Sequence, residues 1–266
     1  MKPFLKWAGG KYKIIDRVLD ALPKGEQLIE PFAGSGAVFL NAEYDEYLIA
    51  DTNADLINLY KQIQTEGREF VTYAAALFLA ENNTEVAYYN FREEFNACTD
   101  VARRSALFIY LNRHCFNGLC RYNSKGGFNV PFGRYAKPAF PEKEILNFYE
   151  KSKRAIFEIA DFKLTMSKAS KRSVVYCDPP YAPLTVTSNF SDYTSSGFDF
   201  TDQQALADSA KNLTSRGIPV VISNHDTEFT RFIYEDAKIL SFDVQRFISS
   251  DAKNRNKAAE LMACYG

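Results

Sequence analysis

Cysteine, histidine and long apolar runs are all scarce in this sequence. The five cysteines are an odd number without the paired spacing of metal ligands, and there are only two histidines. We therefore expect neither a disulfide framework nor a metal site. Reduced thiols and the absence of a signal-peptide apolar region near Met1 predict a cytoplasmic protein. Apolar runs such as 220–222 are too short to span a bilayer, so no membrane association is expected.

The remaining composition is that of an ordinary globular protein. The 266 residues are 46% hydrophobic and 24% charged, which is enough for one large α/β domain or a domain with an insertion. The net charge of −1 does not by itself indicate a polyanionic partner. A surface for nucleic acid must therefore come from local charge asymmetry.

Hydrophobic periodicity indicates an α/β fold with a Rossmann-like sheet. Helices are expected at 55–64, with Asn53 as the N-cap, and at 201–215, with Thr201 as the cap at which the helix begins. From 54 to about 110 the chain reads as mainly helical, and 124–127 marks the turn of a β-hairpin. The segments expected to be strands are 27–30, 47–51, 155–159, 174–177 and 218–223. The order of elements predicts a discontinuous α/β sheet domain, 1–53 and 142–266, with an inserted domain at 54–141.

A glycine turn follows the first expected strand. It carries two glycines, Gly34 and Gly36, that allow a ligand to approach the backbone at a helix N-terminus. The third glycine of the dinucleotide fingerprint is missing, which disfavours a pyrophosphate cofactor. Asp51 ends the next strand, where an acid commonly binds ribose hydroxyls. Either feature alone fits an ordinary turn, but their order favours a nucleoside-type cofactor. Segment 4–11, with the single tryptophan, fits a ligand-wrapping loop and a packed terminus equally well.

Asp178-Pro179-Pro180-Tyr181 follows the buried run 174–177. The prolines end the strand and hold a carboxylate, two carbonyls and an aromatic ring at the sheet edge where ligands bind. Such an array suits methylation of a conjugated amino group, whose N–H groups need acceptors as positive charge develops on nitrogen. On four residues alone, a strand end with a tight turn is the more frequent explanation.

Acidic residues are absent from segment 101–140, which contains seven lysines and arginines interleaved with asparagines and aromatics. Cations contact phosphates, and arginine and asparagine read guanine and adenine edges. A solvated basic face is the alternative, but nucleic acid is favoured. His225 could line a target pocket, although a structural hydrogen bond is expected. For 246–250, target contact and an edge strand stay equally open.

These pieces, in this order, closely resemble the Dam family of DNA adenine-N6 methyltransferases, group α. The resemblance covers essentially the whole chain. Segments 4–11 and 30–36 resemble the family's cofactor motifs, and 178–181 resembles its catalytic motif. The family's recognition region is resembled by 111–113, 117–123 and 128–135. The resemblance implies a Rossmann-like methyltransferase sheet with an inserted target-recognition domain. It also implies double-stranded DNA as the partner. No obligate protein partner is inferred, and a monomer is expected.

The resemblance implies S-adenosylmethionine as the methyl donor and a flipped adenine, in GATC, as the target. The adenine amino group would donate to Asp178 and the Pro179 carbonyl, Tyr181 would stack on the ring, and no cysteine nucleophile is needed. The catalytic residues implied are Asp178, Pro179, Pro180 and Tyr181. The cofactor residues implied are Trp7, Ala8, Gly9, Lys11, Glu30, Pro31, Phe32, Ala33, Gly34, Ser35, Gly36, Asp51, Asp161, Phe162 and Asp178.

For DNA, the resemblance implies that Arg121 contacts a guanine, Lys6 the outer guanine, and Leu119 and Pro131 a thymine methyl group. Asn117 and Phe116 would fill the space left by the flipped base, although Phe116 departs from the tyrosine common in close relatives. The DNA-binding residues implied are Lys6, Arg92, Phe116, Asn117, Leu119, Arg121, Asn129, Pro131, Arg134 and Tyr135; Arg92 and Asn129 would hold phosphates.

Three alternatives remain at this point. An N4-cytosine methyltransferase would be favoured by serine in place of Asp178, and a protein-glutamine methyltransferase by asparagine. A non-catalytic DNA-binding protein could retain the fold, but Asp178, Gly34, Gly36 and Asp51 are all intact.

Overall fold

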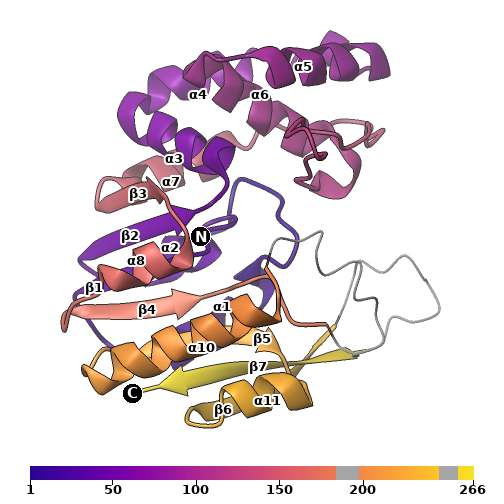
Figure 1. Cartoon of the computed structure of the whole chain (residues 1–266). Coiled ribbons are helices and arrows are strands. Elements are labelled where there is room, and N and C mark those ends of the chain that lie inside the picture. The colour runs from indigo at the N-terminus through magenta and orange to yellow at the C-terminus, as the bar shows by residue number, and fades with distance from the viewer. Residues whose placement is uncertain (184–197, 246–256) are drawn as a thin grey trace. The chain divides into compact units, whose positions relative to one another are not determined.

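The computed structural model describes residues 1–183, 198–245 and 257–266 (Figure 1). Its strands form a seven-stranded sheet in the order β3-β2-β1-β4-β5-β7-β6. The predicted α/β class is confirmed. The segment 246–250, whose role the sequence left open, lies outside the described residues.

The centre of the sheet is parallel. β1 pairs in parallel with β2 and β4, and β4 with β5, whereas β7 runs antiparallel to both β5 and β6. Buried strands of this kind read as continuous apolar runs, and all five residues of β4 are buried. The strands are β1 (Gln27–Glu30), β2 (Glu46–Asp51), β3 (Ala155–Ile159), β4 (Ser173–Cys177), β5 (Val220–His225), β6 (Lys238–Gln245) and β7 (Lys257–Tyr265).

The chain divides into two compact units. Unit 1 comprises Met1–Leu19, Ala33–Glu43 and Asp51–Ile159, and unit 2 comprises Asp20–Phe32, Tyr44–Ala50 and Ala160–Gly266. The division into a catalytic domain and a recognition domain at 54–141 stays a prediction. Within the described ranges, no helix is long and apolar enough to cross a membrane.

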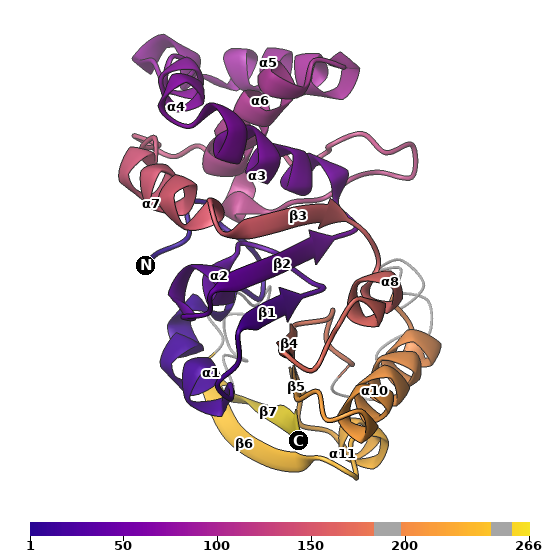
Figure 2. The same ribbon diagram turned by 90° about the vertical axis from the view of Figure 1, so that its left-hand side faces the viewer.

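In unit 2 the core lies between the sheet and three helices. Figure 2 shows α8 (Phe162–Ser167), α10 (Phe200–Ser215) and α11 (Glu228–Ile233) on the same side of the sheet. Alternate strand residues, including Val175 and Ile222, pack with buried side chains of these helices because successive strand residues face opposite sides. This packing fixes the direction in which the ends of β4 and β5 leave the sheet.

Unit 1 is mainly helical, as predicted for residues 54–110. Its central helix is α6, in which eight consecutive residues, 105–112, are buried, and which contacts α3, α4 and α5. The α-helices of the unit are α2 (Ala37–Asn41), α3 (Ala54–Glu66), α4 (Arg68–Ala75), α5 (Glu85–Ala97), α6 (Val101–His114) and α7 (Glu142–Ser152). Short 3-10 turns lie at η1 (Lys11–Ile14), η2 (Ala80–Asn82) and η3 (Phe116–Gly118), and α1 (Ile15–Ala21) continues from η1.

The predicted helix caps have different outcomes. Asn53 caps α3, as expected, because its side chain accepts a hydrogen bond from the Leu56 amide; such a cap contributes about 1 kcal/mol. Thr201 as the cap of α10 is wrong, because the helix begins at Phe200 behind Asp199. Asp199 and Asp202 form a reciprocal capping box, which satisfies two backbone amides and therefore outcompetes a cap at Thr201.

The expected hairpin is present as a tight turn without regular strands. The Asn123 amide donates to the Gly127 carbonyl at 2.9 Å, and Tyr122 and Phe128 form an isolated antiparallel bridge. The glycine-rich turn signal is therefore confirmed, whereas the arms 119–123 and 128–132 do not form a continuous ladder. Side-chain contacts hold these arms, as described below.

Candidate active site

The segment Asp178-Pro179-Pro180-Tyr181 follows β4 at its carboxyl end, in unit 2. β4 lies between the parallel strands β1 and β5, so the segment leaves the middle of the parallel region. Asp178 is half-buried, and Cys177 before it is fully buried. Burial raises the pKa of the Cys177 thiol well above its ordinary value. The thiol stays protonated at neutral pH, so the one ionisable nucleophile next to Asp178 is inert.

Two buried amide side chains fix the backbone on both sides of Tyr181. The Gln203 Nε2 donates to the Pro180 carbonyl at 2.7 Å, and the Ala182 amide donates to Asn224 Oδ1 at 2.9 Å. The two side chains are also bonded to each other, since Asn224 Nδ2 donates to Gln203 Oε1 at 2.9 Å. Both are fully buried. The backbone of the tetrapeptide is therefore held by α10 and β5 rather than by its own turn.

The Tyr181 side chain is held at both its hydroxyl and its ring edge. The hydroxyl donates to Glu260 Oε2 of β7 at 3.1 Å. The ring meets the His225 ring edge-on, with centroids 4.8 Å apart. Burial, with the negative charges of Asp178 and Glu260, raises the pKa of Tyr181 far above its ordinary value. Tyr181 is thus a neutral phenol, suited to ring stacking rather than to proton transfer.

His225 has the structural role expected of it. Its Nδ1 lies 2.6 Å from the Ala182 carbonyl oxygen, which fixes Nδ1 as the donor because a carbonyl only accepts. His225 and Asn224 therefore bind the two polar groups of the same residue, Ala182. Glu260 and Gln203 were not singled out in the sequence, where each is one polar residue in an ordinary strand or helix.

A second cluster in unit 2 consists of aromatic rings. Phe32 stacks on Phe162 with centroids 5.8 Å apart and an interplanar angle of 21°, and Phe198 meets both rings edge-on. Phe162 is buried, whereas Asp161 is exposed and caps α8 through the Leu164 amide. Asp161 thus places its carboxylate at the surface, beside the stacked rings of Phe32 and Phe162. Glu30 and Pro31 of the same unit are buried.

In unit 1 the glycine turn, Asp51 and Trp7 lie together. Gly34 and Gly36 have φ of +45° and +69°, which residues with a Cβ rarely adopt. The Gly34 amide donates to Asp51 Oδ2 at 3.1 Å, and the Asn53 amide donates to Asp51 Oδ1 at 2.9 Å. A Cβ on Gly34 would lie 3.0 Å from the Trp7 indole nitrogen. The tryptophan is therefore packed on the turn.

Asp51 is a carboxylate in a partly dry environment. Burial raises its pKa, and the amides of Asn53 and Gly34 oppose that shift by favouring the charged form. Lys11 is buried, and its Nζ donates to the Gly9 carbonyl at 2.6 Å. Ala8 and Gly9 are exposed, whereas Ala33 and Ser35 are buried. In the part of the chain that the structure describes, no cluster of His, Cys, Asp or Glu could hold a metal ion.

The predicted DNA-binding residues also belong to unit 1. The N-terminal segment is attached to them by Asn112, a buried side chain that accepts from the Lys6 amide at 2.9 Å and donates to the Lys6 carbonyl at 2.8 Å. The Lys6 Nζ then lies 4.0 Å from the centroid of the Tyr135 ring. The Tyr135 hydroxyl accepts from the amide of Asn117, whose φ is +54°. The structure thus brings Lys6, Asn117 and Tyr135 together.

The other predicted DNA-binding residues differ in exposure and partners. Arg121 is exposed, and its Nε donates to Asn129 Oδ1 at 2.8 Å across the hairpin. Arg92 donates to the Val130 carbonyl at 3.3 Å. Arg134 is exposed and lies 3.6 Å from Glu85. Phe116 and Pro131 are exposed and Leu119 is half-buried.

Comparisons with known proteins show the family of this chain. Residues 7–248 match the model of a family described as D12 class N6 adenine-specific DNA methyltransferase. The DNA adenine methylase of Salmonella typhi is 52% identical over 264 residues, which cover 99% of this chain and 95% of the relative. That of Serratia marcescens is 52% identical over 265 residues, with 99% and 98% covered. That of Escherichia coli (strain K12) is 51% identical over 264 residues, with 99% and 95% covered. The chain therefore belongs to the D12 class of N6 adenine-specific DNA methyltransferases.

Proposed function

We propose that this adenine-specific DNA methyltransferase uses S-adenosylmethionine as its donor and modifies adenine in GATC duplex sites. The observation that carries the proposal is the fixed backbone of the catalytic segment. Because Gln203 already donates to the Pro180 carbonyl, the acceptors assigned to the substrate are the Asp178 carboxylate and the Pro179 carbonyl. Two acceptors match the two N–H bonds of an exocyclic amine.

The residues of unit 1 fit a nucleoside-type donor. The Asp51 oxygens accept backbone amides and have further lone pairs, which can accept from the hydroxyls of a ribose. The turn at Gly34 has no side chain to block a ligand, and the Trp7 ring borders it. In unit 2, the Phe32–Phe162 pair is assigned to the donor's purine. When bound, S-adenosylmethionine supplies an electrophilic methyl group.

The catalytic residues act by binding and orienting the adenine. The Asp178 carboxylate and Pro179 carbonyl accept the amino N–H groups and stabilise the positive charge that develops on nitrogen as it is methylated. The Tyr181 ring stacks on the flipped base, and its hydroxyl, already bonded to Glu260, keeps the ring in place. Removing the base from the duplex costs a few kcal/mol, which this stacking offsets in part.

Sequence reading is assigned to the hairpin and to the N-terminal segment. Arg121 is exposed on the arm 119–123, and arginine binds the O6 and N7 atoms of guanine with two hydrogen bonds. Lys6, held by Asn112 at its backbone, is assigned to the outer guanine. Arg92 and Asn129 are assigned to phosphates, which position the protein without reading sequence.

The proposal predicts transfer of labelled methyl from S-adenosylmethionine to a GATC duplex and not to a GTAC duplex of the same composition. Equal labelling of the two duplexes would refute the specificity. Asp178→Ala should abolish transfer and leave DNA binding largely unchanged, because the carboxylate acts on the amine rather than on the DNA backbone. Loss of duplex binding in that variant would refute the role of Asp178.

A further inference from the structure

The arm that carries Arg121 is anchored at the residues on both sides of it. Neighbouring residues of an extended segment point in opposite directions. Cys120 and Tyr122 are half-buried, whereas Arg121 is exposed. Asn53 Nδ2 donates to Cys120 Sγ at 3.6 Å, and the Tyr122 hydroxyl donates to Asp55 Oδ2 at 2.7 Å. Both partners belong to the first residues of α3 and its cap.

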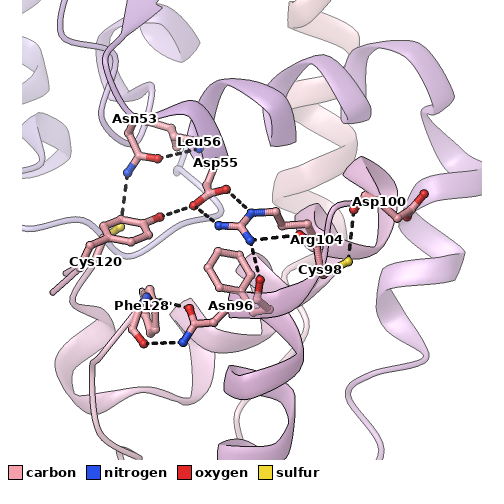
Figure 3. A network of polar contacts seen from close by, with 11 residues as sticks. Asn53, Asp55, Leu56, Asn96, Cys98, Asp100, Arg104, Cys120 and Phe128 are labelled. Atoms are coloured by element: carbon pink, nitrogen blue, oxygen red, sulfur yellow. Dashed lines mark hydrogen bonds and ion pairs between the residues drawn. The ribbon is translucent and has the colours of Figure 1, made fainter. Parts of the chain in front are cut away.

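Asp55 is the centre of this anchor. Figure 3 shows its carboxylate facing the Arg104 guanidinium, which donates from Nε at 2.5 Å and from Nη2 at 3.1 Å. Only 12% of the Asp55 side chain is exposed, so its orientation is set by these bonds. Arg104 is fixed in turn, because its Nη1 donates to the carbonyls of Phe95 and Cys98. Tyr122 therefore bonds to a carboxylate that cannot rotate away from it.

The opposite arm of the hairpin has its own anchor on α5. The Asn96 side chain accepts from the Phe128 amide at 2.8 Å and donates to the Phe128 carbonyl at 3.2 Å, as Figure 3 shows. Phe128 forms the bridge to Tyr122. Because the two arms share so few backbone bonds, these side chains set the register that a regular ladder would otherwise fix.

We propose that Tyr122 and Asp55 are positioning residues for sequence reading, which orient Arg121 towards the base that it reads. This inference rests on the proposed role of Arg121. Without the Tyr122 bond the arm loses one of the contacts that fix its orientation, and Arg121 is then less precisely placed for two simultaneous hydrogen bonds to guanine. Asp55 and Tyr122 touch neither base nor methyl donor; they act through Arg121.

The test compares discrimination in four proteins: wild type, Tyr122→Phe, Arg121→Ala and the double variant. The quantity is the ratio of kcat/KM on a GATC duplex to kcat/KM on duplexes with one G·C pair changed. Arg121→Ala should lower this ratio about 5- to 150-fold at one pair. Tyr122→Phe should lower it roughly three- to tenfold at the same pair, as expected for one lost buried hydrogen bond. The double variant should discriminate no worse than Arg121→Ala alone.

Tyr122→Phe is preferred to Asp55→Ala, because removal of Asp55 leaves the Arg104 charge partly buried without its partner and destabilises the protein. The matched control is Tyr44→Phe, which removes a 2.6 Å bond from a tyrosine hydroxyl to the Pro23 carbonyl. It should leave the ratio unchanged. Equal losses of rate on all duplexes in Tyr122→Phe, or multiplicative effects in the double variant, would overturn the positioning role. An unaltered ratio in Arg121→Ala would instead refute the proposed role of Arg121 in reading a guanine.

Discussion

The polar groups that flank Tyr181 are bonded to side chains from distant parts of the sequence. Gln203 of α10 holds the Pro180 carbonyl, and Asn224 of β5 holds the Ala182 amide. A buried carbonyl or amide without a partner costs about 1–3 kcal/mol. The pair therefore stabilises one backbone conformation of the segment Asp178-Pro179-Pro180-Tyr181.

Gln203→Ala should lower kcat about tenfold and leave the KM for the methyl donor nearly unchanged. The Pro180 carbonyl loses its donor, and the orientation of Asp178 and Tyr181 becomes less defined; 1.4 kcal/mol in the barrier corresponds to a factor of ten. Steady-state kinetics on a GATC duplex checks this. Gln204→Ala is the matched control, because its amide donates to Asp208 on the exposed side of the same helix. Equal kcat values in the two variants would contradict the role of Gln203.

At the level of single residues, the sequence alone was enough to predict a candidate site where its residues are neighbours in the chain. Asp178-Pro179-Pro180-Tyr181 is contiguous, and its stiffness follows from the prolines alone. Gln203 and Glu260 could not be predicted, because each reaches the tetrapeptide only after α10 and β7 pack on the sheet. Asp51 lies beside the glycine turn because β1 and β2 are parallel neighbours. The sequence left Trp7 open between a ligand-wrapping loop and a packed terminus, because its contact with the turn depends on tertiary packing.

Among the elements, α6 is a largely buried helix whose last residue, His114, is titratable. His114 is buried in its last turn, and its ring stacks on Tyr110 with centroids 3.8 Å apart. Its Nδ1 lies 2.8 Å from the Tyr110 carbonyl. Burial lowers the pKa of His114 from 6.5 to about 4. The folded protein therefore holds this side chain neutral under conditions in which the unfolded chain takes up a proton.

The consequence is a loss of stability on acidification. Between pH 6.5 and about 4 the unfolded state binds more protons at His114, so the free energy of unfolding falls as the pH falls through this window. The full effect is about 3 kcal/mol, of which about 2 kcal/mol is expected by pH 5. Urea unfolding at pH 7 and pH 5 measures it, and His114→Gln should lose less stability over that interval. The same pH dependence in both proteins would refute this assignment.

The sequence predicted elements well where one signal dominated. The cap Asn53 has no competing residue next to it, whereas Asp199 and Thr201 are both capping types and only the pairing with Asp202 decides between them. The antiparallel strands β6 and β7 were not assigned, although residues 239–244 contain the alternation that indicates an edge strand. The hairpin was predicted from its turn, but its anchoring by Asp55 and Asn96 depends on tertiary packing.

For the whole molecule, the net charge of −1 conceals the basic segment 101–140, which contains seven cations and no acid. In the structure, acidic residues from outside the segment pair with some of these cations. Of its seven cations, Arg103 is bonded to Glu94 at 2.6 Å and Arg104 to Asp55 at 2.5 Å. Both acids lie outside 101–140, so the sequence segment alone could not reveal them. Arg134 also lies 3.6 Å from an acid outside the segment, Glu85, but 77% of its side chain is exposed. Arg121 and Arg134 are the cations of this segment proposed to contact DNA and to release counterions.

The most direct test of the central claim offers the whole protein all possible DNA target sequences in one experiment. A randomised duplex library is incubated with the protein and S-adenosylmethionine, and the modified bases are mapped with their flanking sequence. We predict N6-methyladenine in GATC and no modified cytosine. N6-methyladenine spread over sites unrelated to GATC, or methyl groups on cytosine N4, would contradict the account.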